Sequence, residues 1–212
     1  MKLEEFIKLV ADMPLIDTEL LLAGVSNPGP AKVQISRWEK AGKLIQLKRG
    51  LYVLASPYRK KAVYGPFIAA TLKQPSYISM EKALEFHNLI PEAVTVWTSV
   101  TPKRPARFRS QEGDFEYSYI KKTLFWGYKS VTLDGQTGFV ATPEKALLDF
   151  FCVRKIKPSQ AYLEEMRLQN LEDINLNTLL AYARKFNKPG ILRTAQELKE
   201  FIAARKGKEE KL

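Results

Sequence analysis

The hydrophobic residues in the N-terminal part of the chain recur at the spacing of three successive helices. A second, short helix is predicted to begin where Asp17 or Thr18 can cap it and to end near Gly24. The third is predicted to run from Asn27-Pro28, an N-cap followed by a proline at the first helical position, to Gly42. The first helix is indicated by apolar residues that share one face: Leu3, Phe6, Ile7 and Val10.

The third helix has two faces of different character. At about 100° per residue, the narrow face that we expect to be buried consists of Ala31, Ile35, Trp38 and Gly42. The opposite face carries Lys32, Ser36, Arg37, Lys40 and Lys43, and Gln34 lies at its edge. Such a helix can be held on its domain by Ile35 and Trp38 while its polar face lies in a groove of DNA.

Strand spacing replaces helical spacing after Gly42. Residues 44–47 and 51–54 are predicted strands, and the basic turn Lys48-Arg49-Gly50 joins them into a hairpin. Three helices followed by a hairpin is the element order of a winged helix-turn-helix. We therefore predict a DNA-binding domain of this type over residues 1–57.

The pattern changes again near Ser56-Pro57. A basic connector, Arg59-Lys60-Lys61, follows, and new helical and strand patterns continue toward the C-terminus. We predict a second, mixed α/β domain over residues 58–212 that ends in a helical region, and an α+β fold class for the whole chain. Because each segment has its own apolar faces, the two domains are expected to carry separable activities.

Helices of the second domain are predicted over residues 64–72, 80–87 and 142–153, and everything after Pro158 has helical spacing. Gln74-Pro75 stops the first of these helices. Ser79 and Thr142 are the expected caps of the next two.

Strands are predicted at residues 77–78, 94–98 and 115–119, where Phe115, Tyr117 and Tyr119 alternate onto one face. A hairpin over residues 131–140 turns at Asp134-Gly135. Between two of the strands, residues 101–109 contain two prolines and several basic side chains, which predicts a basic loop.

Positive charge is concentrated around the third helix and the first hairpin. Residues 28–61 hold nine basic residues and one acid, in a chain whose net charge is +11. A basic stripe along one helix and its hairpin is typical of phosphate binding. We expect Lys32, Ser36 and Arg37 to lie in the major groove, and the remaining DNA-binding residues to contact phosphates: Lys40, Lys43, Lys48 and Arg49.

The basic loop at residues 101–109 has two interpretations. It is either a second surface for nucleic acid or an acidic partner, or a solvated turn. Its candidate partner-binding residues are Lys103, Arg104, Arg107 and Arg109.

Candidate chemistry elsewhere is sparse. With one histidine, His87, and one cysteine, Cys152, the sequence has no His/Cys metal cluster, and both residues are expected to be structural, the cysteine as a buried thiol. No glycine-rich phosphate-binding motif is present. We expect no enzymatic activity and no cofactor. The enzymatic alternative is a metal-dependent nuclease that uses Asp114 and Glu116 with Lys121 or Lys122.

No stretch has the roughly 20 uninterrupted apolar residues of a membrane helix, and Glu4 and Glu5 stand where a signal peptide would be positively charged. The expected location is therefore the cytoplasm.

A series of short motifs resembles the AbiEi family of type IV antitoxins, and it spans roughly residues 33–150 in the order found in that family. The motifs are Ser36-Arg37-Trp38, Gly42-Lys43-Leu44, Arg49-Gly50-Leu51-Tyr52, Pro75-Ser76-Tyr77-Ile78-Ser79, Ala83-Leu84, Leu89-Ile90-Pro91-Glu92, Thr98-Ser99-Val100-Thr101, Gly127-Tyr128 and Ala141-Thr142-Pro143-Glu144-Lys145-Ala146-Leu147-Leu148-Asp149.

The resemblance implies two roles. The N-terminal domain would repress its own operon by binding inverted repeats in double-stranded DNA. The second domain would counter a nucleotidyltransferase-type toxin encoded separately, without needing a stable complex with it. Two alternatives stay open: a winged-helix regulator whose second domain senses a small ligand, and a DNA-targeted nuclease.

Overall fold

The computed structural model describes residues 2–209 and has a mixed α+β architecture. The N-terminal part contains helices α1 (Leu3–Val10), α2 (Thr18–Leu21) and α3 (Gly29–Lys40). Its small antiparallel sheet has the order β1-β3-β2, formed by β1 (Ile16–Asp17), β2 (Leu44–Lys48) and β3 (Leu51–Leu54). The helices and the hairpin lie where the sequence predicted them, whereas strand β1 was not predicted.

A mixed six-stranded sheet of order β6-β7-β5-β4-β9-β8 forms the middle of the described chain. Strands β5 and β7 pair in parallel, as do β4 and β9, and the other neighbours are antiparallel. The strands are β4 (Tyr77–Ile78), β5 (Val96–Thr101), β6 (Ala106–Ser110), β7 (Gly113–Tyr119), β8 (Tyr128–Leu133) and β9 (Gln136–Ala141).

Helices surround this sheet and continue beyond it. Helix α4 packs against β9, β4 and β5, and α6 joins α5 to the C-terminal helices. The helices are α4 (Gly65–Leu72), α5 (Glu81–Phe86), α6 (Pro143–Arg154), α7 (Gln160–Glu165), α8 (Leu176–Lys185) and α9 (Pro189–Glu209). Short 3-10 turns are η1 (Ser56–Tyr58), η2 (Lys122–Leu124) and η3 (Leu171–Asp173).

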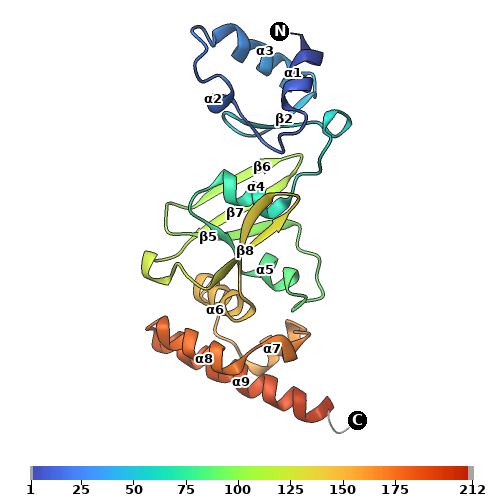
Figure 1. Ribbon diagram of the computed structural model, residues 1–212. Helices are drawn as coiled ribbons and strands as arrows, with labels where there is room; N and C mark the ends of the chain where they lie inside the picture. Colours follow the sequence, from blue (N-terminus) through green and yellow to red (C-terminus); the bar gives the residue numbers. More distant parts are fainter. Residues whose placement is uncertain (1, 210–212) are drawn as a thin grey trace.

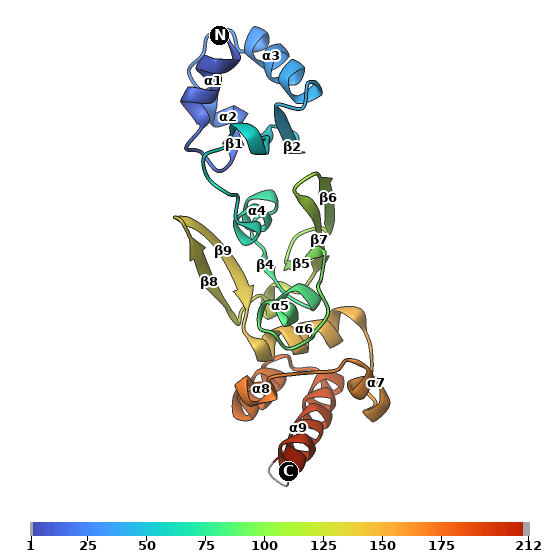
Figure 2. The same cartoon turned by 90° about the vertical axis from the view of Figure 1, so that its right-hand side faces the viewer.

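The molecule is elongated (Figure 1). The N-terminal helices lie at one end, the large sheet in the middle and helices α7–α9 at the other end. After a quarter turn, α4 lies between the β8–β9 hairpin and strands β6 and β7 (Figure 2). The first hairpin faces the large sheet, and β2 packs against β6.

The buried apolar residues form two clusters. The smaller one holds the N-terminal helices together and consists of Phe6, Val10, Ile16, Ile35, Trp38, Leu44 and Leu54. The larger one fills the rest of the described chain, and it also contains Leu47, Leu51 and Val53 of the first hairpin. The hairpin therefore contributes side chains to both clusters, and a cut near Ser56 would remove three buried residues from the larger one.

Several predictions about the second part need correction. Residues 106–109, expected in a loop, belong instead to strand β6, and every residue of β6 pairs with a residue of β7. Ser79 does not cap α5; its hydroxyl donates to Asp149 instead, 2.9 Å away. Of the three aromatic residues predicted to share one face of β7, Phe115 and Tyr117 are buried, whereas Tyr119, the last residue of the strand, is 54% exposed. The cap at Thr142 is confirmed, since its hydroxyl accepts a hydrogen bond from the Lys145 amide.

Candidate nucleic-acid interface

Helix α3 presents a polar face to solvent and an apolar face to the small core. Its exposed side chains include Lys32, Ser36, Arg37 and Lys40. On the other side, Ile35 and Trp38 are only 4% and 6% exposed. The Trp38 ring packs on Phe6 with 4.8 Å between ring centroids. The predicted division of this helix is therefore confirmed for these side chains, and Trp38 is a core residue.

The ends of α3 differ slightly from the prediction. The helix begins at Gly29 with Pro28 at the N-cap position, and the Asn27 carboxamide oxygen accepts a hydrogen bond from the Gly29 amide, 3.2 Å away. Gly42 is exposed and lies beyond the helix instead of on its buried face. Its φ of +67° is in the left-handed region that glycine adopts without strain, so the chain can reverse there into β2.

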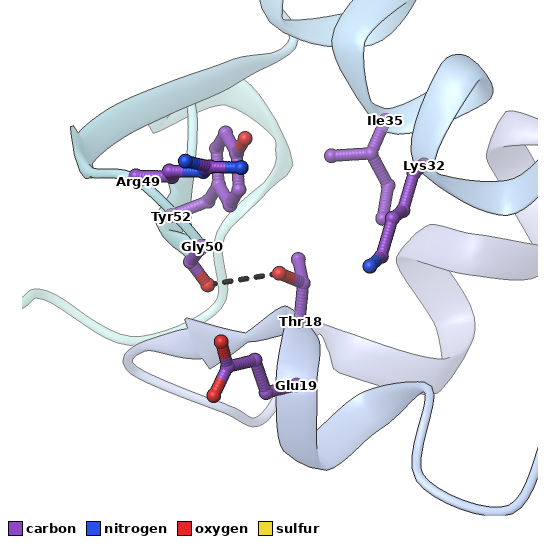
Figure 3. A pocket seen from close by; sticks show the side chains of 7 residues that line it. All are labelled: Thr18, Glu19, Lys32, Ile35, Arg49, Gly50 and Tyr52. Carbon is purple, nitrogen blue, oxygen red and sulfur yellow. Dashed lines mark hydrogen bonds between the residues drawn. The ribbon is translucent and has the colours of Figure 1, made fainter. Parts of the chain in front are cut away.

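A pocket of about 430 Å³ separates the start of α3 from the hairpin turn (Figure 3). Lys32 enters it from α3, Arg49 and Gly50 from the turn, and Thr18 and Glu19 from the start of α2. The Thr18 hydroxyl donates to the Gly50 carbonyl oxygen at 3.0 Å, and the Thr18 amide donates to the same oxygen at 2.9 Å. These two bonds fix the backbone of the turn, and Arg49 in that turn lies across the pocket from Lys32 (Figure 3).

Lys48 has a different role from the one predicted. Its ammonium donates hydrogen bonds to the carbonyl oxygens of Thr71 and Leu72, at 3.1 and 2.9 Å, which are the last carbonyls of α4. Burial lowers the pKa of Lys48 from its usual value, and the nearby Asp17 carboxylate opposes that shift. The side chain therefore caps a helix of the second part, and we leave it out of the candidate interface. Nothing in the sequence pattern pointed to this contact.

A second contact between the N-terminal part and the rest of the chain involves the connector. The Arg59 guanidinium forms an ion pair with Glu112, and its Nε donates to the Leu54 carbonyl oxygen at 2.9 Å. Both charged side chains are 17% exposed. Arg59, which the sequence placed in a basic connector, therefore links the end of β3 to the turn between β6 and β7.

Lys43 lies at the margin of the α3 surface. Its ammonium hydrogen-bonds to the Tyr58 hydroxyl and lies 5.0 Å from the centre of that ring. The side chain is partly buried as a result. Lys43 and Lys48 are both partly buried, so Lys40 and Arg49 are the exposed members of the predicted phosphate-contacting set.

Ion pairs neutralise part of the predicted second basic surface. Arg107 pairs with Glu116, and Arg109 lies 3.6 Å from Asp114, so each arginine of β6 faces an acid of β7. Lys103 and Arg104 are exposed in the preceding turn. The two acids of the nuclease hypothesis are thus paired with arginines. Among residues 2–209, no group of three or more His, Cys, Asp and Glu residues is arranged to hold a metal ion.

The histidine and the cysteine occupy different environments. His87 Nε2 lies 2.7 Å from the Ala141 carbonyl oxygen, which ties the end of α5 to β9. Cys152, predicted to be buried, is partly exposed, and its sulfur accepts a hydrogen bond from the Lys188 ammonium at 3.2 Å.

A buried charged network was missed by the sequence analysis. Lys145 and Asp149, one helical turn apart on α6, form an ion pair with no exposed side-chain surface. The Tyr77 hydroxyl accepts from Lys145 at 2.8 Å and donates to Asp149 at 2.9 Å. Burial lowers the pKa of Lys145 and raises that of Asp149, and their mutual attraction opposes both shifts. Asp149 lies within an apolar run, and its spacing from Lys145 was the available signal.

Comparison with models of known protein families gave no match, and no significantly similar curated protein was found. Within the part of the chain that the structure describes, no helix combines the length and hydrophobicity required to cross a bilayer.

Proposed function

We propose that this protein binds double-stranded DNA through α3 and represses transcription. The observation that carries the proposal is the exposed face of α3, where Lys32, Ser36, Arg37 and Lys40 project to solvent directly opposite the buried Ile35 and Trp38. An α-helix fits the major groove of B-form DNA, and basic side chains along it neutralise phosphates. The order of three helices and a hairpin supports a winged helix-turn-helix interpretation of this region.

The side chains of this surface would make two kinds of DNA contact, to base edges and to phosphates. Arg37, near the middle of the exposed face, can form the bidentate contact with a guanine edge that reads sequence. Lys32 and Ser36 would lie in the same groove. Lys40 and Arg49 would contact phosphates and fix the orientation without reading sequence.

The second part of the proposal rests on the resemblance to AbiEi antitoxins. The large sheet and its helices would counter a nucleotidyltransferase-type toxin on a separate chain, and a stable complex would not be required. The larger apolar cluster supports this region as a folded unit able to have a role beyond DNA binding. Repression and protection together would make the protein an autoregulating antitoxin.

Binding isotherms test the DNA-binding proposal. Full-length protein is titrated against a labelled duplex covering the promoter of its own gene and against a scrambled duplex of equal length. Arg37→Ala is expected to weaken promoter binding by about 1–3 kcal/mol and to reduce the preference over scrambled DNA. Lys129→Ala is the matched control, because Lys129 is an exposed basic residue on β8, far from α3 in sequence. Equal isotherms for parent and Arg37→Ala would reject the proposed interface.

Growth rescue tests the antitoxin role. The gene is expressed with a neighbouring nucleotidyltransferase gene whose product stops growth, and a promoter reporter is read in the same cells. Arg37→Ala is expected to raise reporter output while protection persists. Growth arrest despite soluble, folded parent protein would reject the antitoxin role. It would not affect the DNA-binding proposal, which the binding isotherms test separately.

A further inference from the structure

A pocket of about 410 Å³ opens beside α4, between that helix and the β8–β9 hairpin. Four aromatic side chains line it: Phe67 from α4, Phe125 before β8, Tyr128 from β8 and Phe139 from β9. Phe139 is 36% exposed, so part of its ring is accessible to a ligand. The volume falls within the usual range for small-molecule sites.

The walls of this pocket are held at a fixed separation. Gly138 of β9 lies so close to Pro66 that a Cβ atom there would be 2.5 Å from the Pro66 backbone. The Gln136 carboxamide accepts from the Tyr64 amide at 3.0 Å and donates to the Ala62 carbonyl oxygen at 2.9 Å. These contacts anchor the N-terminal end of α4 to β9. The pocket is therefore formed before any ligand arrives.

The aromatic floor is also rigid. Tyr128 stacks on Tyr77 with 4.6 Å between ring centroids and 22° between ring planes. The Tyr77 hydroxyl is in turn held by the buried Lys145–Asp149 pair. Tyr128 consequently has a fixed ring face behind it, which favours stacking of a planar ligand over insertion of a flexible chain.

The polar lining indicates the complementary chemistry of the ligand. The Thr71 hydroxyl donates to the Phe67 carbonyl oxygen at 2.8 Å, and the Ser76 hydroxyl donates to that of Lys73 at 2.6 Å. Each hydroxyl oxygen can still accept a hydrogen bond, and Gln74 supplies an amide at the rim. All the residues that line the pocket are uncharged. A charged ligand would lose hydration without gaining a partner.

We propose that this pocket binds an uncharged, planar heteroaromatic molecule with N–H donors, of the size of a nucleobase or a nucleoside. The rings of Phe125, Tyr128 and Phe139 would contact its faces. The hydroxyls of Thr71 and Ser76 would accept from its N–H groups. The site is separate from the exposed face of α3, so the proposal does not depend on DNA binding.

Heteronuclear NMR of the full-length protein, without DNA, tests this inference. Adenine, adenosine and indole are the uncharged probes, and AMP is the charged counterpart of adenosine. At least one uncharged probe is expected to shift the amide signals of Ala70, Thr71 and Thr137 in a saturable manner. AMP should bind about tenfold more weakly than adenosine, because no cation in the lining offsets the lost hydration of its phosphate.

Two substitutions on one hairpin provide the matched comparison. Phe139→Ala should weaken binding about tenfold, within the range seen when a stacked ring is removed. Leu133→Ala, at a 53% exposed position of β8 outside the pocket lining, should leave it unchanged. Ala70→Trp should abolish binding by filling the pocket. Absence of saturable shifts with every uncharged probe, equal affinity of AMP and adenosine, or equal binding by parent and Phe139→Ala would overturn the proposal.

Discussion

The Lys48 ammonium lies 2.9 Å from the carbonyl oxygen of Leu72, so a lysine of the N-terminal hairpin caps the C-terminal end of α4. The carbonyls at a helix C-terminus lack intrahelical partners and carry partial negative charge, which makes a lysine a suitable cap. With the Arg59–Glu112 ion pair, this contact attaches the hairpin to the second part of the chain.

The salt dependence of DNA binding should distinguish Lys40 from Lys48. Lys40 is exposed on α3 and free to release a counterion from a phosphate, whereas the Lys48 ammonium is held by α4. Lys40→Ala is expected to reduce the slope of log K against log salt by about one unit. Lys48→Ala should leave the slope unchanged. The slopes are measured with the promoter duplex. A reduced slope for Lys48→Ala would show that Lys48 contacts a phosphate after all.

Replacing Trp38 should destabilise the N-terminal part. Trp38 is 6% exposed and packs on Phe6, so Trp38→Ala is expected to cost about 3–5 kcal/mol of unfolding free energy. Urea unfolding, followed through NMR signals of α1, measures it. Val33→Ala is the control, because Val33 is on the same helix but 53% exposed. A variant that unfolds like the parent but fails to bind DNA would mean that Trp38 contacts DNA instead of the core.

The sequence predicted the N-terminal elements well because their signals are local. Helical spacing located α1 and α3, and the same spacing separated Trp38 from Arg37. Gly42 precedes the hairpin and Gly50 lies in its turn, and their positive φ values match the turns that glycine favours. Side-chain burial on α3 followed directly from these assignments.

Contacts between distant parts of the chain could not be predicted in this way. Lys48 looked like a DNA-binding residue because charge alone does not reveal that the end of α4 lies next to it. Residues 106–109 were assigned to a loop because the preceding Pro102 and Pro105 and the many basic side chains obscured the pairing with β7. The α4 pocket brings together segments from three regions of the sequence, and no periodicity records their proximity.

The two apolar clusters predict different effects for two leucines of β2. Leu44 belongs to the smaller cluster and Leu47 to the larger one, and they are 2% and 3% exposed. Leu47→Ala is expected to destabilise the second part by about 2–5 kcal/mol, whereas Leu44→Ala should act mainly on the N-terminal helices. Hydrogen exchange of α5 and α1 amides separates the two effects. Equal loss of protection in α1 alone for both variants would show that the hairpin does not stabilise the larger core.

A related expectation concerns a fragment that begins near Arg59. The predicted division into two separable domains implies that it would fold alone, yet it would lack Leu47, Leu51 and Val53 of the larger cluster. Such a fragment should melt at a lower temperature than the same residues in the full chain. Extending the fragment to include residues 44–58 should raise its melting temperature part of the way to that of the full chain. Identical melting temperatures for both fragments would show that the second part folds independently of the hairpin.

The buried Lys145–Asp149 pair should be costly to break on one side only. Both side chains are fully buried, so Asp149→Ala leaves an ammonium without a counter-charge in a low-dielectric environment. The expected loss is about 3–5 kcal/mol of unfolding free energy, measured by urea titration followed by circular dichroism. The loss should exceed that for Glu92→Ala, which breaks the exposed Arg167–Glu92 pair and should change stability little.

Removing both charges together separates an electrostatic cost from a simple packing defect. Lys145→Met combined with Asp149→Ala leaves no unpaired charge and differs from Asp149→Ala only at residue 145, where methionine is close to lysine in volume, so it should recover most of the stability lost in Asp149→Ala. The Tyr77 hydroxyl, which bridges the two charges, would lose both partners in this variant, so recovery should be incomplete. Adding Tyr77→Phe should then improve stability further. If the double variant were as unstable as Asp149→Ala, the cost would lie in packing around α6 and not in the unpaired charge.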